Sequence, residues 1–200
     1  LIAFPEAREL GQCERLQALL GEQLVALETD IQPNPDVSWL APLYERLWRD
    51  HPEVECIIAL GGGSVIDCAK AMLTSTPSGT FAELLDCLAG NTSLSQPPGR
   101  VRSLIAVPTT AGTGSEVTPY AILTKNVLPD IVLTTVPLEK DREAFAHLEK
   151  RTKQSISHHI FPALALVDVT YLQTASRTGC INTAVDTLAH LIESHLNTNS

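Results

Sequence analysis

The chain has 200 residues, of which 44% are hydrophobic, so it carries enough apolar material for a packed core, and this argues against a wholly disordered protein. Its formal net charge of −9 argues against nucleic acid or an anionic membrane surface as a partner, because long-range attraction is missing. No apolar run approaches the roughly 20 residues that a membrane span needs. Five scattered cysteines without a C-x-x-C pair favour free thiols in a reducing cytoplasm over disulfides or a zinc site.

The first half of the chain predicts strands and helices in alternation. Apolar residues at positions 10, 13, 16, 19 and 20 have the spacing of an amphipathic helix. Cys56 to Leu60 is short, apolar and rich in isoleucine, as in a central strand. Asp36 or Ser38 can cap the helix before it. The expected order is strand 1–4, helix 6–20, strand 23–28, helix 39–49, strand 56–60 and helix 64–73. This alternation is typical of a parallel sheet with covered faces, an α/β fold of the Rossmann-like kind.

The second half mixes further strands with helices and ends in a long helix. We expect a helix at 81–88, strands at 101–107, 119–124, 155–160 and 163–169, and a helix at 183–196. Residues 126–150 combine a β-branched run with a charged, helix-like one, and we interpret them as an insertion or a flap. The pattern changes after Asp168, which predicts an α/β domain over 1–170 and the beginning of an α-helical domain over 171–200.

Three glycines follow the strand at 56–60 directly, and a helix pattern begins behind them at Ser64. Unpaired N–H groups in the first turn of a helix, together with the helix dipole, form a site for an anion. Glycines also let a diphosphate approach the backbone closely. The loop lacks the G-K-[ST] ending of a Walker motif, and Ile66 stands where G-x-G-x-x-G has its last glycine. The loop indicates a phosphate-bearing ligand, with a ligand-free glycine turn as the alternative.

A second polar segment, Pro108 to Thr118, follows the strand at 101–107 and is rich in hydroxyls and glycines. We expect it at the carboxyl edge of the sheet, where open α/β sheets bind ligands. A Ser/Thr-rich surface turn is the alternative, but it explains one or two hydroxyls more readily than five within ten residues.

Asp186 and His190 stand four residues apart in the C-terminal helix, so they share one helix face. A carboxylate and an imidazole at this spacing can share a divalent ion. On spacing alone the better interpretation is an ordinary surface pair, because zinc sites have three or four protein ligands and iron sites usually more than two.

Together these segments resemble the iron-containing (group III) alcohol dehydrogenase family. Residues 61–70 are similar to its fingerprint G-G-G-S-x-x-D-x-A-K, and residues 108–118 match its segment P-T-T-A-G-T-G-S-E-V-T. Residues 183–193 resemble its metal helix, T-G-x-D-A-x-x-H-x-x-E. The likeness runs along the whole chain and is weakest between Asn126 and Lys150.

The resemblance implies a dinucleotide-binding domain over 1–170 and an incomplete all-α metal-binding domain over 171–200. The residues it implies are Gly62, Gly63, Ser64 and Asp67 at the pyrophosphate, Thr109, Thr110, Thr113 and Ser115 in the cofactor groove, Lys153 near the ribose and nicotinamide, and Asp186 and His190 as two metal ligands. The implied cofactors are NAD or NADP and Fe²⁺, or else Zn²⁺. The implied reaction is hydride transfer between the nicotinamide and an alcohol or aldehyde that the metal polarises.

Four departures from the family pattern matter. The family's other two metal ligands are histidines on later helices, so we expect a fragment, truncated after the first metal-ligand helix and inactive alone. Pro5 stands about where NAD-preferring members carry an acidic residue, which leaves NADP open. Ala184 replaces a glycine, and the segment 126–150 is longer than the family's turn.

We therefore expect a cytoplasmic, homodimeric alcohol dehydrogenase or aldehyde reductase that acts on a small molecule with NAD(P) and a metal. A zinc-dependent glycerol or polyol dehydrogenase on the same scaffold is one alternative. The other is a non-catalytic nucleotide-binding module that has lost its metal domain.

Overall fold

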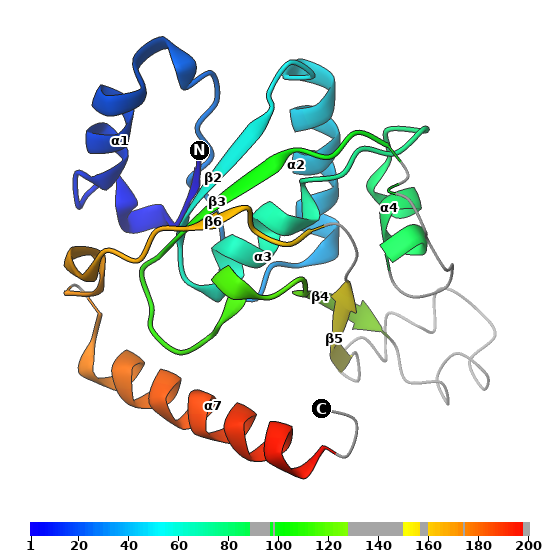
Figure 1. The fold of residues 1–200 in the computed structure, drawn as a ribbon. Helices are drawn as coiled ribbons and strands as arrows, with labels where there is room; N and C mark the ends of the chain where they lie inside the picture. Colours follow the sequence, from blue (N-terminus) through cyan, green and yellow to red (C-terminus); the bar gives the residue numbers. More distant parts are fainter. Residues whose placement is uncertain (89–96, 98, 128–149, 157–159, 174, 198–200) are drawn as a thin grey trace, which may run out of the picture.

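The computed structural model describes residues 1–88, 97, 99–127, 150–156, 160–173 and 175–197, and its centre is a four-stranded parallel sheet (Figure 1). The strands stand in the order β1 (Ile2–Ala3), β2 (Cys56–Gly61), β3 (Ser103–Pro108) and β6 (Leu164–Ala165). β2 and β3 pair along their whole lengths, from Cys56 opposite Ser103 to Gly61 opposite Pro108. The two polar loops predicted from the sequence therefore leave the same edge of the sheet next to each other.

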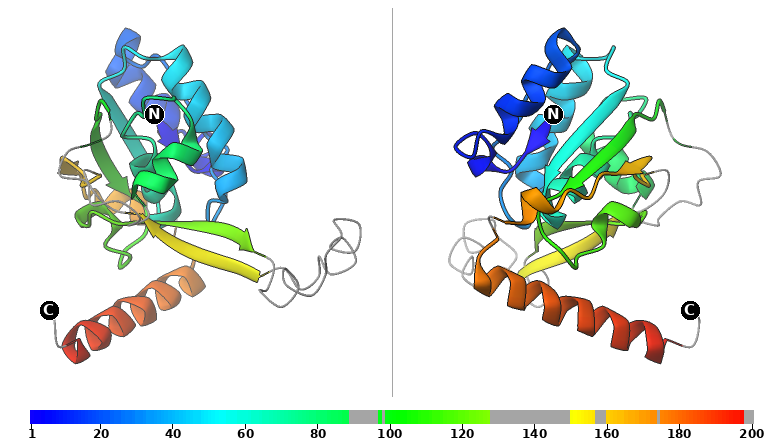
Figure 2. Two further views of the ribbon diagram at one scale, coloured as in Figure 1. Left: turned by 90° about the vertical axis from the view of Figure 1, so that its right-hand side faces the viewer. Right: turned by 60° about the vertical axis from the view of Figure 1, so that its left-hand side comes forward.

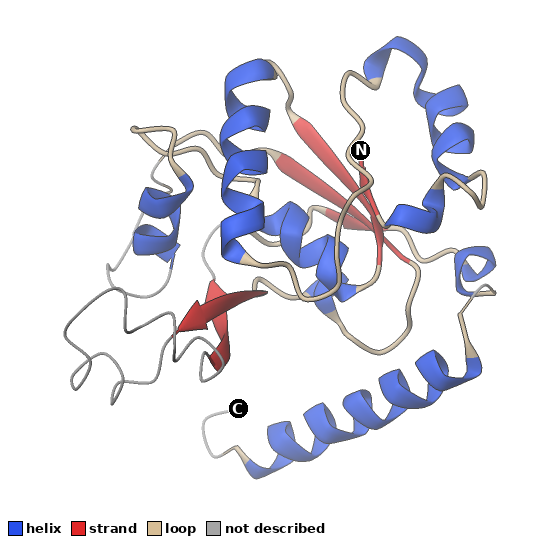
Figure 3. Ribbon diagram, turned by 180° about the vertical axis from the view of Figure 1, so that it is seen from behind, coloured by secondary structure: helices blue, strands red, loops and turns tan. Residues whose placement is uncertain are grey.

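The two central strands send alternate side chains into two cores, one on each face of the sheet. Ile57 and Ala59 belong to the core that contains residues of α2 (Val37–Asp50), α3 (Gly63–Ala71) and α4 (Phe81–Leu88). Leu60 and Val107 belong to the second core, together with residues of α1 (Gln12–Leu20) and the 3₁₀ turns η1 (Pro5–Ala7) and η5 (Val169–Leu172). Figure 3 shows α2 and α3 over one face. The predicted α/β architecture with both faces covered is confirmed.

Local signals set several helix ends close to the predicted positions. The side chain of Asp36 caps α2, with its Oδ1 accepting a hydrogen bond of 2.9 Å from the Ser38 N–H. α4 has the predicted bounds. The predicted helix 6–20 is divided, because Pro5 opens a 3₁₀ turn and Gly11 has a φ of 69°, so the α-helix begins only at Gln12. A further 3₁₀ turn, η2 (Gly21–Gln23), follows it.

Two predicted strands are wrong or too long. The segment 23–28 pairs through a single bridge, between Ile2 and Glu28, because β1 has only two residues and offers no longer edge. The strand predicted at 163–169 is reduced to Leu164–Ala165. Val167 and Val169 beyond it are two-thirds exposed, so their β-branched pattern does not reflect burial in a sheet.

Two parts of the structure stand apart from the main sheet (Figure 2). β4 (Ala121–Val127) and β5 (Lys150–Ile156) form an antiparallel ribbon, and the segment expected as an insertion or flap lies outside the described residues except for its ends in this ribbon. α7 (Arg177–Leu196) begins earlier than predicted, with Ser176 as its cap, and has no buried residue. The described helices include none that is long and apolar enough to cross a membrane. The division into domains at 170 stays a prediction.

Candidate functional site

The glycine loop joins the carboxyl end of β2 to the N-terminus of α3. Gly62 is the N-cap of α3 and supplies no side chain to the helix end, so the first N–H groups of the helix keep their hydrogen-bonding capacity. A Cβ on Gly61 would lie 2.5 Å from a methyl carbon of Val65, and one on Gly62 would lie 3.0 Å from the Thr110 hydroxyl. A side chain on Gly61 would therefore overlap Val65, and one on Gly62 would press on Thr110, whereas the glycine at position 62 itself lines a cleft.

The loop after β3 lies beside the glycine loop. The Thr109 N–H donates to the Gly61 carbonyl over 3.0 Å, so the two loops are bonded to each other. The hydroxyl oxygen of Thr110 faces Gly62 and is buried, without a hydrogen-bond partner among the described residues. A buried hydroxyl without a partner is costly and marks a place for a ligand or an ordered water.

A cleft of about 520 Å³ opens at this edge, between the two loops and α7. Gly62, Thr109 and Thr110 line it on one side. The N-terminal half of α7 lines the other side with small residues, Ser176, Gly179, Cys180, Thr183, Ala184 and Thr187. The cleft combines a helix N-terminus, hydroxyls and a small-residue wall, a combination that fits the phosphates of a dinucleotide.

Asp67 and Ser115, both predicted at the cofactor, bond to each other and to the buried Lys70, and their roles toward a cofactor stay predictions. The Ser115 hydroxyl donates to Asp67 Oδ1 over 2.5 Å, and Asp67 Oδ2 accepts from the N–H of Ile122. Lys70 is fully buried, and its Nζ donates to the Ser115 hydroxyl (3.0 Å) and to the Tyr120 carbonyl (2.6 Å). These hydrogen bonds connect the segment 115–122 to α3.

Burial sets the electrostatics of this cluster. The loss of water raises the pKa of the Asp67 carboxyl and lowers the pKa of the Lys70 ammonium, since it disfavours each charged form. The hydrogen bonds to Asp67 and the opposite charges, 3.7 Å apart, counteract both shifts. Lys70 was not singled out from the sequence. Its signal was the final lysine of the fingerprint, three residues after Asp67.

Of the other predicted cofactor residues, Gly63, Ser64 and Thr113 lie in or beside the same two loops. The Ser64 hydroxyl accepts a hydrogen bond of 3.0 Å from the N–H of Asn34, a residue with a φ of 55°. Gly63 faces Thr113, whose carbon atoms would lie 3.4 Å from a Cβ at that glycine. Lys153 lies in β5 opposite Thr124, and its side chain falls outside the described atoms. The roles of all these residues toward a cofactor stay predictions.

Asp186 and His190 lie one turn apart on α7, as their spacing predicted. His190 Nε2 is 3.9 Å from Asp186 Oδ1, and both side chains are about half-exposed. Among the described residues, no three or more His, Cys, Asp and Glu side chains gather as a metal site requires. The pair therefore offers two donors of suitable chemistry, fewer than a firmly held zinc or iron ion needs.

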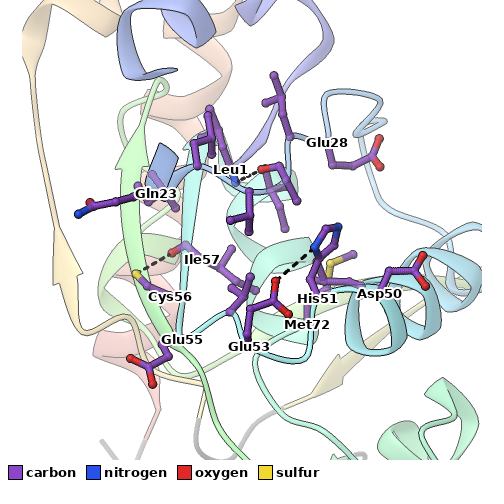
Figure 4. A pocket seen from close by; sticks show the side chains of 18 of the residues that line it. Leu1, Gln23, Glu28, Asp50, His51, Glu53, Glu55, Cys56, Ile57 and Met72 are labelled. Atoms are coloured by element: carbon purple, nitrogen blue, oxygen red, sulfur yellow. Dashed lines mark hydrogen bonds and ion pairs between the residues drawn. The ribbon is translucent and has the colours of Figure 1, made fainter. Parts of the chain in front are cut away.

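A larger pocket of about 640 Å³ lies at the opposite end of the strands (Figure 4). Its walls are mostly apolar and include Leu1, Ile57 and Met72, with His51 and Glu53 paired at 3.6 Å near its rim. Cys56 lines it at the first position of β2, whereas the glycine loop follows the last. It is therefore separate from the candidate site.

Comparisons with known proteins agree with this geometry. Alcohol dehydrogenase 4 of Schizosaccharomyces pombe is 28% identical over 201 residues, which cover 99% of this chain and 40% of that protein. The structure of sulfoacetaldehyde reductase from Bifidobacterium kashiwanohense in complex with NAD⁺ matches with a TM-score of 0.70 and 27% identity, over 96% of this chain and 44% of that one. An iron-containing alcohol dehydrogenase from Thermotoga maritima matches with a TM-score of 0.68 and 26% identity, over 98% and 47%.

The chain thus spans less than half the length of these relatives. The sequence profile of the iron-containing alcohol dehydrogenases matches residues 1–137, a range that includes β1, the glycine loop and the whole segment 108–118. This match covers more than half of the chain, and the chain belongs to the iron-containing alcohol dehydrogenase family.

Proposed function

We propose that this chain supplies the dinucleotide-binding part of a metal-dependent, NAD(P)-linked alcohol dehydrogenase or aldehyde reductase. The observation that carries the proposal is the cleft at the N-terminus of α3, which Gly62 lines without a side chain and where the buried Thr110 hydroxyl has no partner within the described part of the chain. The related sulfoacetaldehyde reductase forms a complex with NAD⁺, which supports a nicotinamide dinucleotide as the ligand.

The chain's own residues would bind and orient the dinucleotide. N–H groups at the start of α3 would donate to pyrophosphate oxygens, with the helix dipole favouring their negative charge. The Thr110 hydroxyl would donate to the same ligand and so gain the partner it lacks. Ser64, Thr109, Thr113 and Lys153 are proposed to complete the groove. Asp67, Lys70 and Ser115 would keep the loops in place from behind.

The proposed metal site is held in part by Asp186 and His190 on α7. When bound, the dinucleotide supplies hydride chemistry, and Fe²⁺ or Zn²⁺ supplies Lewis-acid polarisation of the alcohol or carbonyl oxygen. Because the described residues give two donors, we expect this chain alone to bind dinucleotide without turnover. A homodimer in the cytoplasm, with a small alcohol or aldehyde as substrate, completes the proposal.

The test is a fluorescence titration of the chain with NADH and with NADPH, each with and without Fe²⁺. We expect saturable binding, weakened at least about tenfold (about 1.4 kcal/mol) by Gly62→Asp, because a carboxylate at the N-terminus of α3 repels phosphate and contacts Thr110. Gln17→Glu is the matched control, since it adds the same charge on an exposed position of α1. It should bind like the unsubstituted chain.

The same titration distinguishes NAD from NADP as the cofactor, and it includes results that would contradict the proposed function. Tighter binding of NADPH would assign NADP, in keeping with Pro5 at the end of β1, and tighter binding of NADH would assign NAD. A folded sample that binds neither nucleotide contradicts the proposed function. Equal affinities of Gly62→Asp and the unsubstituted chain would show that binding occurs elsewhere.

A further inference from the structure

The segment 108–118 and the helix α7 touch at Gly112. The Thr187 hydroxyl of α7 donates to the Gly112 carbonyl over 3.1 Å, across 75 positions of the sequence. Gly112 has a φ of 110°, and a Cβ there would lie 2.3 Å from the Thr187 hydroxyl oxygen and 2.8 Å from the Thr183 carbonyl. The loop backbone thus rests directly on the helix, and only glycine fits at this point.

The single proton of the Thr187 hydroxyl serves two acceptors. The hydroxyl also donates to the Thr183 carbonyl of its own helix over 2.8 Å. A hydroxyl has one donor, so the two bonds form a three-centre arrangement or alternate. The bond to Gly112 is therefore an addition to the usual bond of a helical threonine to its own backbone, and it joins the helix to the loop.

Thr187 lies between the two predicted metal ligands. At about 100° per residue, Asp186 and His190 project about 100° and about 60° to the same side of Thr187. The apolar residues Ile181, Val185, Leu188 and Ile192 project to the other side, about 100–160° away. A bond at Thr187 therefore sets the rotation of α7, and with it the direction of the carboxylate and the imidazole.

We propose that Thr187 is a positioning residue that fixes the rotation and the axial position of α7 against the dinucleotide loop, and so couples dinucleotide binding to metal binding at Asp186 and His190. This inference rests on the proposed function. A dinucleotide that orders the loop would order the helix through Gly112, and a metal on the helix would order the loop by the same contact. The two ligands then change each other's affinity by one common factor.

The first experiment examines the helix–loop contact without any ligand. Cys180 lies on the Thr187 side of α7 and lines the cleft, so its labelling reports on the contact between α7 and the loop. Cys56 lies at the far end of β2 and reports non-specific changes, and both cysteines are exposed. Iodoacetamide labelling, followed by peptide mass spectrometry, gives the rate at each thiol. In Thr187→Val, we expect a Cys180 rate raised by up to about fivefold, the shift that corresponds to a net hydrogen bond of about 1 kcal/mol. Thr187→Ser should keep the original rate.

The second experiment measures the coupling itself. The NADH dissociation constant is determined with and without saturating Zn²⁺, and the ratio of the two is compared among the unsubstituted chain, Thr187→Val and Thr187→Ser. We expect a ratio different from one in the unsubstituted chain and in Thr187→Ser, and a ratio close to one in Thr187→Val. A purely structural threonine would change both dissociation constants together and leave the ratio unchanged.

The outcomes separate this inference from the proposed function. Absence of NADH binding to the unsubstituted chain contradicts the proposed function, and the labelling rates then still decide whether Thr187 anchors the helix. Equal Cys180 rates in the unsubstituted chain and Thr187→Val overturn the anchor. A ratio of one in the unsubstituted chain, or an equal ratio in Thr187→Val, overturns the coupling.

Discussion

Replacing Lys70 with methionine tests the buried cluster behind the candidate site. Lys70 has no exposed side-chain surface, and its Nζ donates to two oxygens within 3.0 Å and lies 3.7 Å from the Asp67 carboxylate. Methionine has similar length but no charge, so Lys70→Met leaves Asp67 without its buried counter-charge and the Tyr120 carbonyl without its donor. Removing one partner of a buried ion pair costs about 3–5 kcal/mol. We expect a loss of this size in the free energy of unfolding, a large fraction of the total of about 5–15 kcal/mol.

Two further variants make the Lys70 measurement interpretable. Urea denaturation, followed by tryptophan fluorescence, gives the free energy of unfolding for each variant. In the double variant Lys70→Met with Asp67→Asn, no buried charge is left unpaired, so its loss should fall short of the sum of the single losses by about 0.5–3 kcal/mol. Arg49→Met breaks an exposed ion pair with Asp50 and should lower the free energy of unfolding far less than Lys70→Met does. A loss below about 1 kcal/mol for Lys70→Met itself would refute the reasoning.

Three smaller predictions use the same unfolding assay. Gly112→Ala should destabilise by at least about 1 kcal/mol more than Gly114→Ala, because both have positive φ but only the first places a Cβ against α7. Hydrogen bonds from Ser78 hold the pKa of Glu83 below its usual 4.5, so the Glu83 carboxylate stabilises the fold above that pH and loses this effect as the pH falls. The difference in unfolding free energy between the unsubstituted chain and Glu83→Gln should therefore shrink from about pH 7 to about pH 3. A difference that stays constant over this range contradicts the prediction. Tyr44→Phe removes a buried hydroxyl that donates 2.8 Å to a backbone carbonyl and should cost about 1 kcal/mol, with no loss arguing against the bond.

Local chemistry made the central part of the fold predictable from the sequence. Strands β2 and β3 are short apolar runs ended by glycine or proline, and their pairing follows from the α/β order of the elements. The two mispredicted strands failed for tertiary reasons. The segment 23–28 has strand-like residues but meets a two-residue neighbour, and the strand at 163–169 ends where its side chains become exposed. Pairing partners and burial are tertiary properties, which single-sequence patterns do not contain.

In the candidate site, too, local features can be predicted from the sequence and tertiary contacts cannot. The glycine loop can be predicted from the sequence because glycine suits a tight turn at a helix N-terminus. The placement of Asp186 and His190 on one helix face can be predicted from their spacing. The burial of Lys70 could not be predicted, since lysine is almost always exposed. The contact of Thr187 with Gly112 joins residues 75 positions apart, a separation that local sequence patterns do not reveal.

The fingerprint residues of the site divide by direction, and this division has a functional consequence. Gly62 and Thr110 line the cleft, so substitutions there would act on the ligand directly, and a side chain on Gly62 would also contact Thr110. Asp67, Lys70 and Ser115 face inward and bond to one another. Substitutions there would lower the affinity for a dinucleotide indirectly, by moving the loops. If the proposed function is right, a short polar motif can be matched residue for residue although only part of it would contact the ligand. The other part gives the first part a fixed geometry, which is what binding by preorganised backbone groups requires.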